Sequence, residues 1–218
     1  MPLVKKSIQD RLLAANIALE NALTDTEILG LLSEFGYDET KINAGKELYN
    51  SADEKFQQQK TEYGEQYAAT GVLQTKWDTS NSFYIKHVKV ARIALKNDYG
   101  DYLKLGLGGS RKRTLSGWLV QSRQFYINAL GDAGIKTKLA EFGITEAKLQ
   151  EGRNLTDEVE AANTTHKKEK GEAQQATLDR DKALDIMEDW LSDFIAISRI
   201  ALEDKPQLLE KMGIVEPS

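Results

Sequence analysis

The sequence predicts an all-α protein built from two tandem, similar helical units, each an up-and-down bundle with a long helical hairpin. Apolar residues recur at three- and four-residue steps along most of the chain, as they do on the buried face of a helix. The run Arg92-Ile93-Ala94-Leu95 returns as Arg199-Ile200-Ala201-Leu202, and other identities hold the same ungapped offset of 107 residues. A repeated structural unit explains these matches. We therefore place the units at residues 1–107 and 108–218.

Each unit is predicted to begin with a medium helix and a short helix. In the first unit these are residues 3–23 and a segment that starts at Thr24 or Asp25, whose side chains can cap a helix, and ends at Gly36. In the second unit they are residues 114–130 and a segment that ends at Gly143. Glycine can take the left-handed conformation that closes a helix.

A long helical hairpin is expected to follow in each unit. Residues 38–97 have helical patterning almost throughout, and one unbroken helix would be roughly 90 Å long, which is too long for a domain of this size. A reversal is therefore predicted at residues 64–71, because glycine is a weak helix former and Gly64 is matched by Gly171. The alternative is one continuous rod. The second hairpin would span residues 145–203, and Pro206 would open a short closing helix.

Composition excludes several classes of protein. Of 218 residues, 40% are hydrophobic and 29% charged, which suits a soluble helical protein. The net charge is −5, and neither half has the basic excess expected for nucleic-acid binding. The absence of cysteine excludes disulfides and thiolate metal sites. No apolar run resembles a signal peptide or a membrane span, so we expect a cytoplasmic protein without a membrane partner.

Aromatic residues near the predicted hairpin tip distinguish the first unit from the second. Phe56, Tyr63, Tyr67 and Trp77 correspond to Asn163, Lys170, Gln174 and Leu184 at the offset of 107. An exposed aromatic cluster would mark a contact surface for a protein partner or for a second copy of the chain. The alternative is that these rings fill a local core.

Two arginines lie in apolar runs at the ends of the predicted hairpins. A buried guanidinium requires a carboxylate partner to offset its desolvation. Arg92 and Arg199 are therefore predicted to form structural ion pairs with Glu34 and Glu141, or with the other recurring pair, Glu39 and Glu146. Anion binding by the two arginines is the functional alternative.

No metal or cofactor site is predicted. The Glu-x-x-His pairs of di-metal bundles are absent, and His166 is expected on the surface. The acidic residues Asp185, Glu188, Asp189 and Asp193 are expected to form a solvated face opposite a buried one. His87 and His166 do not occupy matching repeat positions, and no nucleophilic set can be assembled from them.

The stretch between the units, Gly106 to Arg113, combines glycines with the basic cluster Arg111-Lys112-Arg113. Glycine loops before helices can bind phosphate. However, the spacing of a P-loop is not met and no strand precedes the glycines. A flexible linker is the preferred interpretation.

These observations favour a non-enzymatic helical scaffold or protein-interaction module. The alternative is a bundle that binds a small ligand or a metal, and an enzyme ranks last because no catalytic constellation is visible. The second half resembles parts of bacterial helical-repeat proteins, and this resemblance implies no activity.

Overall fold

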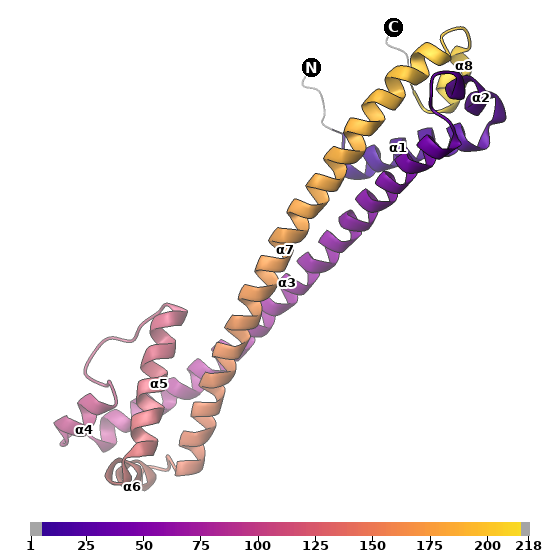
Figure 1. Cartoon of the computed structure of the whole chain (residues 1–218). Helices are drawn as coiled ribbons and strands as arrows, with labels where there is room; N and C mark the ends of the chain where they lie inside the picture. Colours follow the sequence, from indigo (N-terminus) through magenta and orange to yellow (C-terminus); the bar gives the residue numbers. More distant parts are fainter. Residues whose placement is uncertain (1–5, 215–218) are drawn as a thin grey trace. The chain divides into compact units, whose positions relative to one another are not determined.

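The computed structural model describes residues 6–214 and confirms the all-α prediction (Figure 1). Within those residues the chain forms eight helices and no strand. None of these helices is long and apolar enough to cross a membrane. In chain order the helices are α1 (Ile8–Thr24), α2 (Thr26–Glu34), α3 (Glu39–Ala94), α4 (Tyr99–Lys104), α5 (Leu115–Gly131), α6 (Ala133–Glu141), α7 (Glu146–Ala201) and α8 (Pro206–Lys211).

The helices recur in length and order. Helices α1 and α5 have 17 residues each, α2 and α6 have 9, α3 and α7 have 56, and α4 and α8 have 6. Every helix of the second set begins 107 residues after its counterpart, as Ile8 and Leu115 illustrate. The helix order therefore repeats at the same offset of 107 residues as the sequence matches.

The predicted hairpin reversal is wrong, because α3 and α7 are each continuous. Residues 64–71 are helical, so the continuous rod is the correct alternative. Gly64 and Gly71 both face open space. A lone helical glycine costs only about 1 kcal/mol relative to alanine, and the segment has neither proline nor a turn-forming pair of residues to stop the helix. The glycines therefore weaken α3 locally without ending it.

The chain divides into two compact units that combine segments from both sequence repeats. Unit 1 contains the residues up to Tyr63 and those from Glu172 onward, and unit 2 contains residues 64–171. Unit 1 therefore joins α1, α2 and the first part of α3 to the end of α7 and to α8. Unit 2 joins the rest of α3 to α4, α5, α6 and the start of α7. The boundaries 1–107 and 108–218 follow from the sequence matches, whereas the compact units are defined by which segments pack together.

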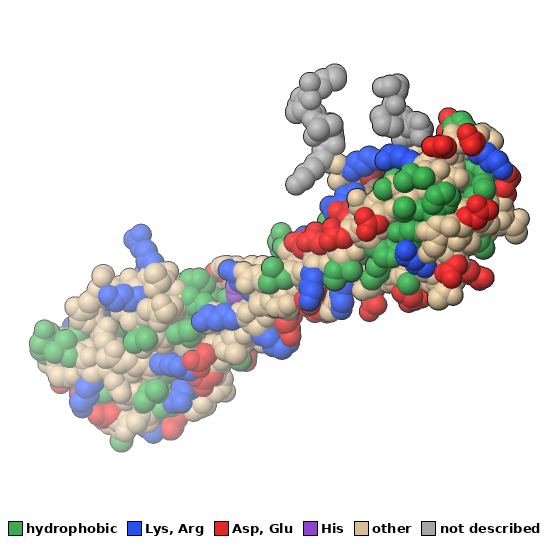
Figure 2. Space-filling model, turned by 45° about the horizontal axis from the view of Figure 1, so that its top comes forward, with side chains coloured by type: hydrophobic (Ala, Val, Ile, Leu, Met, Phe, Trp, Pro, Cys, Tyr) green, Lys and Arg blue, Asp and Glu red, His purple; other side chains and the backbone are tan. Residues whose placement is uncertain are grey.

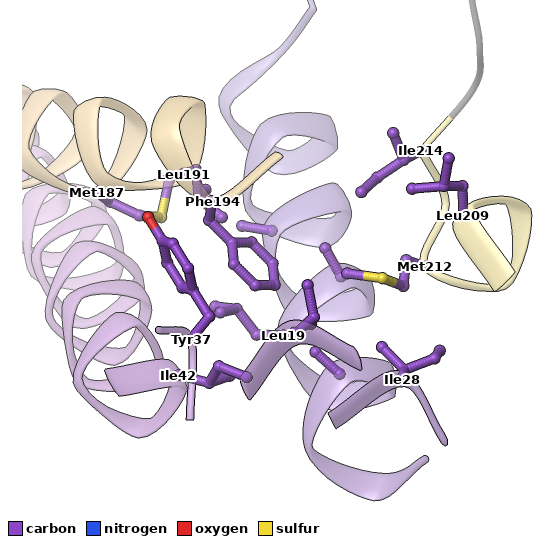
Figure 3. Packing of buried hydrophobic residues seen from close by; sticks show 14 of the residues in the cluster. Leu19, Ile28, Tyr37, Ile42, Met187, Leu191, Phe194, Leu209, Met212 and Ile214 are labelled. Carbon is purple, nitrogen blue, oxygen red and sulfur yellow. The ribbon is translucent and has the colours of Figure 1, made fainter. Parts of the chain in front are cut away.

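The core of unit 1 is formed by one face of each of its five helical segments. Leu19, Ile28, Ile42 and Phe194 are fully buried and come from α1, α2, α3 and α7. Met212, directly after α8, completes the cluster, as Figure 3 shows. Burial of apolar surface, at about 25 cal/mol per Å², is the main force that holds these segments together.

The core of unit 2 is richer in aromatic side chains. Phe125 and Tyr126 from α5 are buried and pack edge-on against Tyr84 of α3, with ring centroids 5.7 and 6.1 Å apart. Ile135 and Leu149, from α6 and α7, are fully buried in the same cluster. Edge-to-face pairs add about 0.5–1.5 kcal/mol each beyond the burial of apolar area. These ring contacts therefore add to the stability of the core of unit 2.

Helices α2 and α6 each begin at an aspartate that also binds a lysine, and each is followed two residues later by a glycine. Asp132 accepts hydrogen bonds from the backbone N–H groups of Gly134 and Ile135, at 2.9 and 3.1 Å, and lies 3.1 Å from Lys104 Nζ. Asp25 caps α2 in the same way and lies 2.6 Å from Lys211 Nζ. The predicted glycine ends are confirmed, because Gly36 and Gly143 both have φ of +78°.

The Asp132 cap makes a testable contribution to stability. Asp132→Ala is expected to lower the free energy of unfolding by about 1–2 kcal/mol, because two N–H groups of α6 lose their acceptor. Asp132→Asn, which keeps the cap but loses the charge next to Lys104, should cost less than about 1 kcal/mol. Urea denaturation followed by circular dichroism measures both values. Equal losses for the two variants would show that the ion pair, rather than the cap, stabilises this end of α6.

Candidate functional site

The four aromatic residues predicted as a tip are spread along α3 and do not form one cluster. Phe56 is buried in the core of unit 1, and Trp77 packs against the core of unit 2. Tyr63 is 39% exposed and Tyr67 is 72% exposed. The core-filling alternative is thus correct for Phe56, because α3 continues past the point where a tip was expected.

The predicted ion pairs of Arg92 and Arg199 are absent. Across residues 6–214, no carboxylate lies within 4.0 Å of either guanidinium, and Glu34 and Glu141 are exposed. Arg92 Nη2 instead donates to the carbonyl oxygens of Leu107 and Gly109, at 3.2 and 3.4 Å. Arg199 is exposed and needs no buried partner. Backbone carbonyls therefore replace the expected carboxylate at Arg92 Nη2, while Arg92 Nε is buried without an acceptor among the described residues.

The most distinctive site is a cavity in unit 2 with a volume of about 570 Å³, which we name the tryptophan cavity. One wall is a single face of α3, since its residues are spaced four apart. The second wall is the segment before α5, and Trp118 of α5 lies between the two. The lining residues are Trp77, Asn81, Ile85, Ser110, Arg111, Lys112, Arg113 and Trp118.

Two indoles and one amide set the hydrogen-bonding character of the cavity. Trp118 Nε1 donates to Asn81 Oδ1 at 3.0 Å. Because an indole N–H is only a donor, Asn81 must present its oxygen to Trp118, which leaves its NH₂ group as a donor. Trp77 Nε1 is buried and has no acceptor among the described residues. The polar groups of Trp77 and Asn81 that remain free are therefore donors.

The basic segment is held in place from two sides. Arg92 binds the carbonyls of Leu107 and Gly109 just before the cluster. On α5, Gln121 accepts from the Lys112 backbone N–H at 2.7 Å and donates to the Ser110 carbonyl at 3.1 Å. The predicted flexible linker is therefore a structured wall of the cavity.

The cavity carries a local positive charge that nothing nearby neutralises. Arg111, Lys112 and Arg113 are exposed, and none has a carboxylate within 4.0 Å in the described part of the chain. No acidic residue lines the cavity. Burial raises the pKa of the adjoining Tyr84, and the charges of Arg111 and Arg92 oppose this shift. A concave site lined by charge of one sign concentrates ligands of the opposite sign.

Unit 1 has a different arrangement at the equivalent positions. At the offset of 107, Trp118 corresponds to Arg11 and Asn81 corresponds to Glu188, and these two side chains form an ion pair. Leu184 replaces Trp77 there. The equivalents of Ser110 to Lys112 are residues 3–5, which lie outside the described residues. Sequence reasoning noted the aromatic and basic residues of unit 2 separately, and only the fold of unit 2 brings them together.

A buried histidine lies deeper in unit 2. His87 is 6% exposed, and its Nδ1 lies 3.3 Å from the Tyr126 hydroxyl. Burial lowers the pKa of His87 to about 4, and the positive charge of Lys148 contributes to the same direction. Burial also raises the pKa of Tyr126, so the hydroxyl keeps its proton and can donate to Nδ1. This pair belongs to the core and does not line the cavity.

The acidic face of α7 is arranged as predicted. Asp185, Asp189 and Asp193 are exposed, while Glu188 is half-buried because it pairs with Arg11. Met187 and Phe194 are buried on the opposite side. These carboxylates therefore form a mainly solvated face.

Several exposed apolar residues recur in both halves. Leu13 and Val120 are 59% and 67% exposed, and Phe35 and Phe142 are 46% and 50% exposed. Figure 2 shows apolar side chains between charged side chains of both signs on the surface. Single exposed apolar residues are common on protein surfaces, and they indicate a binding site only where they form a patch or line a pocket.

The comparisons with known proteins add no relative. No family model matches the chain, and no curated protein or solved structure is significantly similar to it. Function must therefore be argued from the site itself.

Proposed function

We propose that the protein is a non-enzymatic interaction module in which the tryptophan cavity holds a segment of a partner protein. The observation that carries this proposal is the composition of the cavity, which combines two indoles and three unpaired cations with no carboxylate. Tryptophan and arginine are the residues most enriched at the energetic centres of protein interfaces. The exposed side chains of Tyr63 and Tyr67 offer further contact area on α3.

A photo-crosslinking experiment tests the interaction. Benzoyl-phenylalanine in place of Ser110, at the rim of the cavity, is expected to crosslink a protein that the same group in place of the exposed Lys89 does not. The crosslinked protein is then purified, and its affinity for the full chain is measured. We expect at least a tenfold loss of affinity when Arg111, Lys112 and Arg113 are all changed to serine. Unchanged affinity, or identical products from both positions, would contradict the proposal.

A second candidate function is the binding of a small molecule in the same cavity. Its volume of about 570 Å³ lies in the range of ordinary ligand pockets, roughly 300–1,000 Å³. Native mass spectrometry of the gently purified protein distinguishes the two functions. Extra mass that disappears on denaturation favours a retained small ligand, whereas a bare chain that still captures a protein favours the interaction module.

A further inference from the structure

We propose that the tryptophan cavity is specific for an organic anion in which a carboxylate or phosphate group is attached to a planar apolar group. This inference rests on the proposed binding role of the cavity and names the chemistry that it recognises. The same chemistry can come from a small molecule or from an acidic side chain beside an aromatic one in a peptide.

The charge selectivity follows from what lines the cavity. Arg111, Lys112 and Arg113 stand next to one another without acidic neighbours. Some cations of unit 2 are paired, as Lys136 is with Glu146 at 2.9 Å and Lys138 with Asp98 at 2.9 Å, and others, such as Lys89, have no carboxylate within 4.0 Å but lie outside the cavity. A basic group without its own carboxylate is free to bind a ligand anion, and arginine forks fit carboxylate and phosphate oxygens.

The free donors favour a ligand that carries an oxygen acceptor, as a carboxylate or a phosphate does. The buried Trp77 N–H has no acceptor, and leaving such a donor unsatisfied costs about 1–3 kcal/mol. This nitrogen is enclosed by protein atoms, so a ligand oxygen reaches it only when the indole turns toward the cavity. The NH₂ group of Asn81 is a second donor, because its oxygen is held by Trp118. The hydrogen bond to Trp118 already orients the Asn81 side chain, so this donor needs little ordering when a ligand binds.

The requirement for a planar group follows from the rings. The Trp77 and Trp118 rings have centroids 6.2 Å apart and planes tilted by 59°, and Ile85 lines the cavity beside them. Trp118 is only 3% exposed and Trp77 is half-buried, so Trp77 and Ile85 provide most of the apolar surface that a flat ligand group can contact. An anion without an apolar part would use only the cations and the two donors.

The segment that carries the three cations has a fixed backbone conformation before a ligand binds. Arg92 and Gln121 hold its backbone at four points between Leu107 and Lys112. Gly117 allows this close approach, because a Cβ there would lie 2.7 Å from Lys112 Cβ. The segment therefore does not have to fold around a ligand, and less of the binding free energy is lost to ordering.

The test uses phenyl phosphate and benzoate as anionic probes, with benzyl alcohol and benzylamine as neutral and cationic counterparts. Isothermal titration of the full chain is expected to give at least tenfold tighter binding of the anions, with affinity that falls as salt rises. Indole N–H resonances report the location. Those of Trp77 and Trp118 should shift, while that of Trp190 in unit 1 should not. Equal affinity for benzyl alcohol, or shifts only at Trp190, would overturn the inference.

Asn81→Asp is the variant that tests the location and charge preference of the site most directly. An aspartate keeps an acceptor for Trp118 Nε1, so the fold is retained, but it removes the free donor and adds a negative charge to the cavity. We expect at least a tenfold loss of affinity for phenyl phosphate. Ser82→Asp adds the same charge at an exposed position outside the cavity lining and should change affinity less than twofold. Equal effects of the two variants would contradict the site.

The outcomes for the ligand class and for the function are separable. A short acidic peptide with one phenylalanine, compared with phenyl phosphate, distinguishes a protein source from a small-molecule source. If no probe binds but the crosslinked partner still depends on Arg111, Lys112 and Arg113, the ligand class is wrong and the interaction stands. If the anions bind but the partner is insensitive to these residues, the interaction is wrong and the ligand class stands.

Discussion

Gly152→Ala is expected to lower the free energy of unfolding of unit 2 by about 1–3 kcal/mol, which is the usual cost of overpacking a core. A Cβ on Gly152 would lie 2.2 Å from Tyr126 Cζ and 2.4 Å from its hydroxyl oxygen. The ring cannot retreat, because Tyr126 is 1% exposed and packs against Tyr84 and Phe125. Glycine in this helix is therefore retained for close packing, despite its low helix propensity.

Two controls separate this steric effect from helix propensity. Gly71→Ala, where no atom lies within 4 Å, should raise the free energy of unfolding by up to about 1 kcal/mol. In a Tyr126→Leu background, which copies Leu19 of unit 1, Gly152→Ala should cost less than about 1 kcal/mol, because the obstructing ring is gone. Urea denaturation of the four variants measures the coupling. A Gly152→Ala variant as stable as the wild type would show that α5 and α7 do not pack this closely.

Local signals in the sequence were sufficient to predict the short elements. The cap of α2, expected at Thr24 or Asp25, and the glycine ends at Gly36 and Gly143 depend only on neighbouring residues, and the structure places the cap at Asp25 and confirms both glycine ends. Pro206 likewise begins α8, as its fixed φ favours. Such features do not depend on which distant segment a helix packs against, so one sequence is enough to place them.

The long-range pairing could not be predicted in the same way. The apolar stripe of α3 can be buried either by a return segment of its own repeat or by the equivalent segment of α7. Both arrangements bury the same positions, because the repeats match at the offset of 107. In the structure residues 64–71 stay helical, at a cost of about 1 kcal/mol for each isolated glycine, and the stripe of α3 is buried by α7 instead of by a return segment.

In the candidate site, too, some residues could be recognised in the sequence, whereas their contacts with one another could not be predicted. Arg111 to Arg113 are visible in the sequence as a basic cluster. Their juxtaposition with Trp77 depends on how α3 and α5 pack in unit 2. The partners of Arg92 were also unpredictable, because carbonyl acceptors on a folded segment have no residue-type signature.

The stability of unit 2 is expected to fall by up to about 3 kcal/mol as the pH decreases from 6.5 to 4, because His87 is buried in its neutral form. The folded pKa of His87 is about 4, against an ordinary value of 6.5, and each pKa unit corresponds to about 1.4 kcal/mol. Above pH 6.5 the imidazole is neutral in both states and the stability is complete. Between pH 6.5 and 4 only the unfolded state takes up the proton, so acid favours unfolding.

His87→Phe should remove this part of the pH dependence. Phenylalanine occupies the equivalent position in unit 1, where Phe194 is fully buried against Trp190, so the fold has a precedent for it. The paired carboxylates Asp25, Asp101 and Asp132 have pKa values lowered from 3.8 by their lysine partners, and their contribution is lost only at lower pH. Urea unfolding at pH 7, 5.5 and 4.5 separates the two ranges. If His87→Phe and the wild type lose stability in parallel from pH 7 to 4.5, then His87 takes up its proton in the folded protein, and its contact with Tyr126 does not keep it neutral.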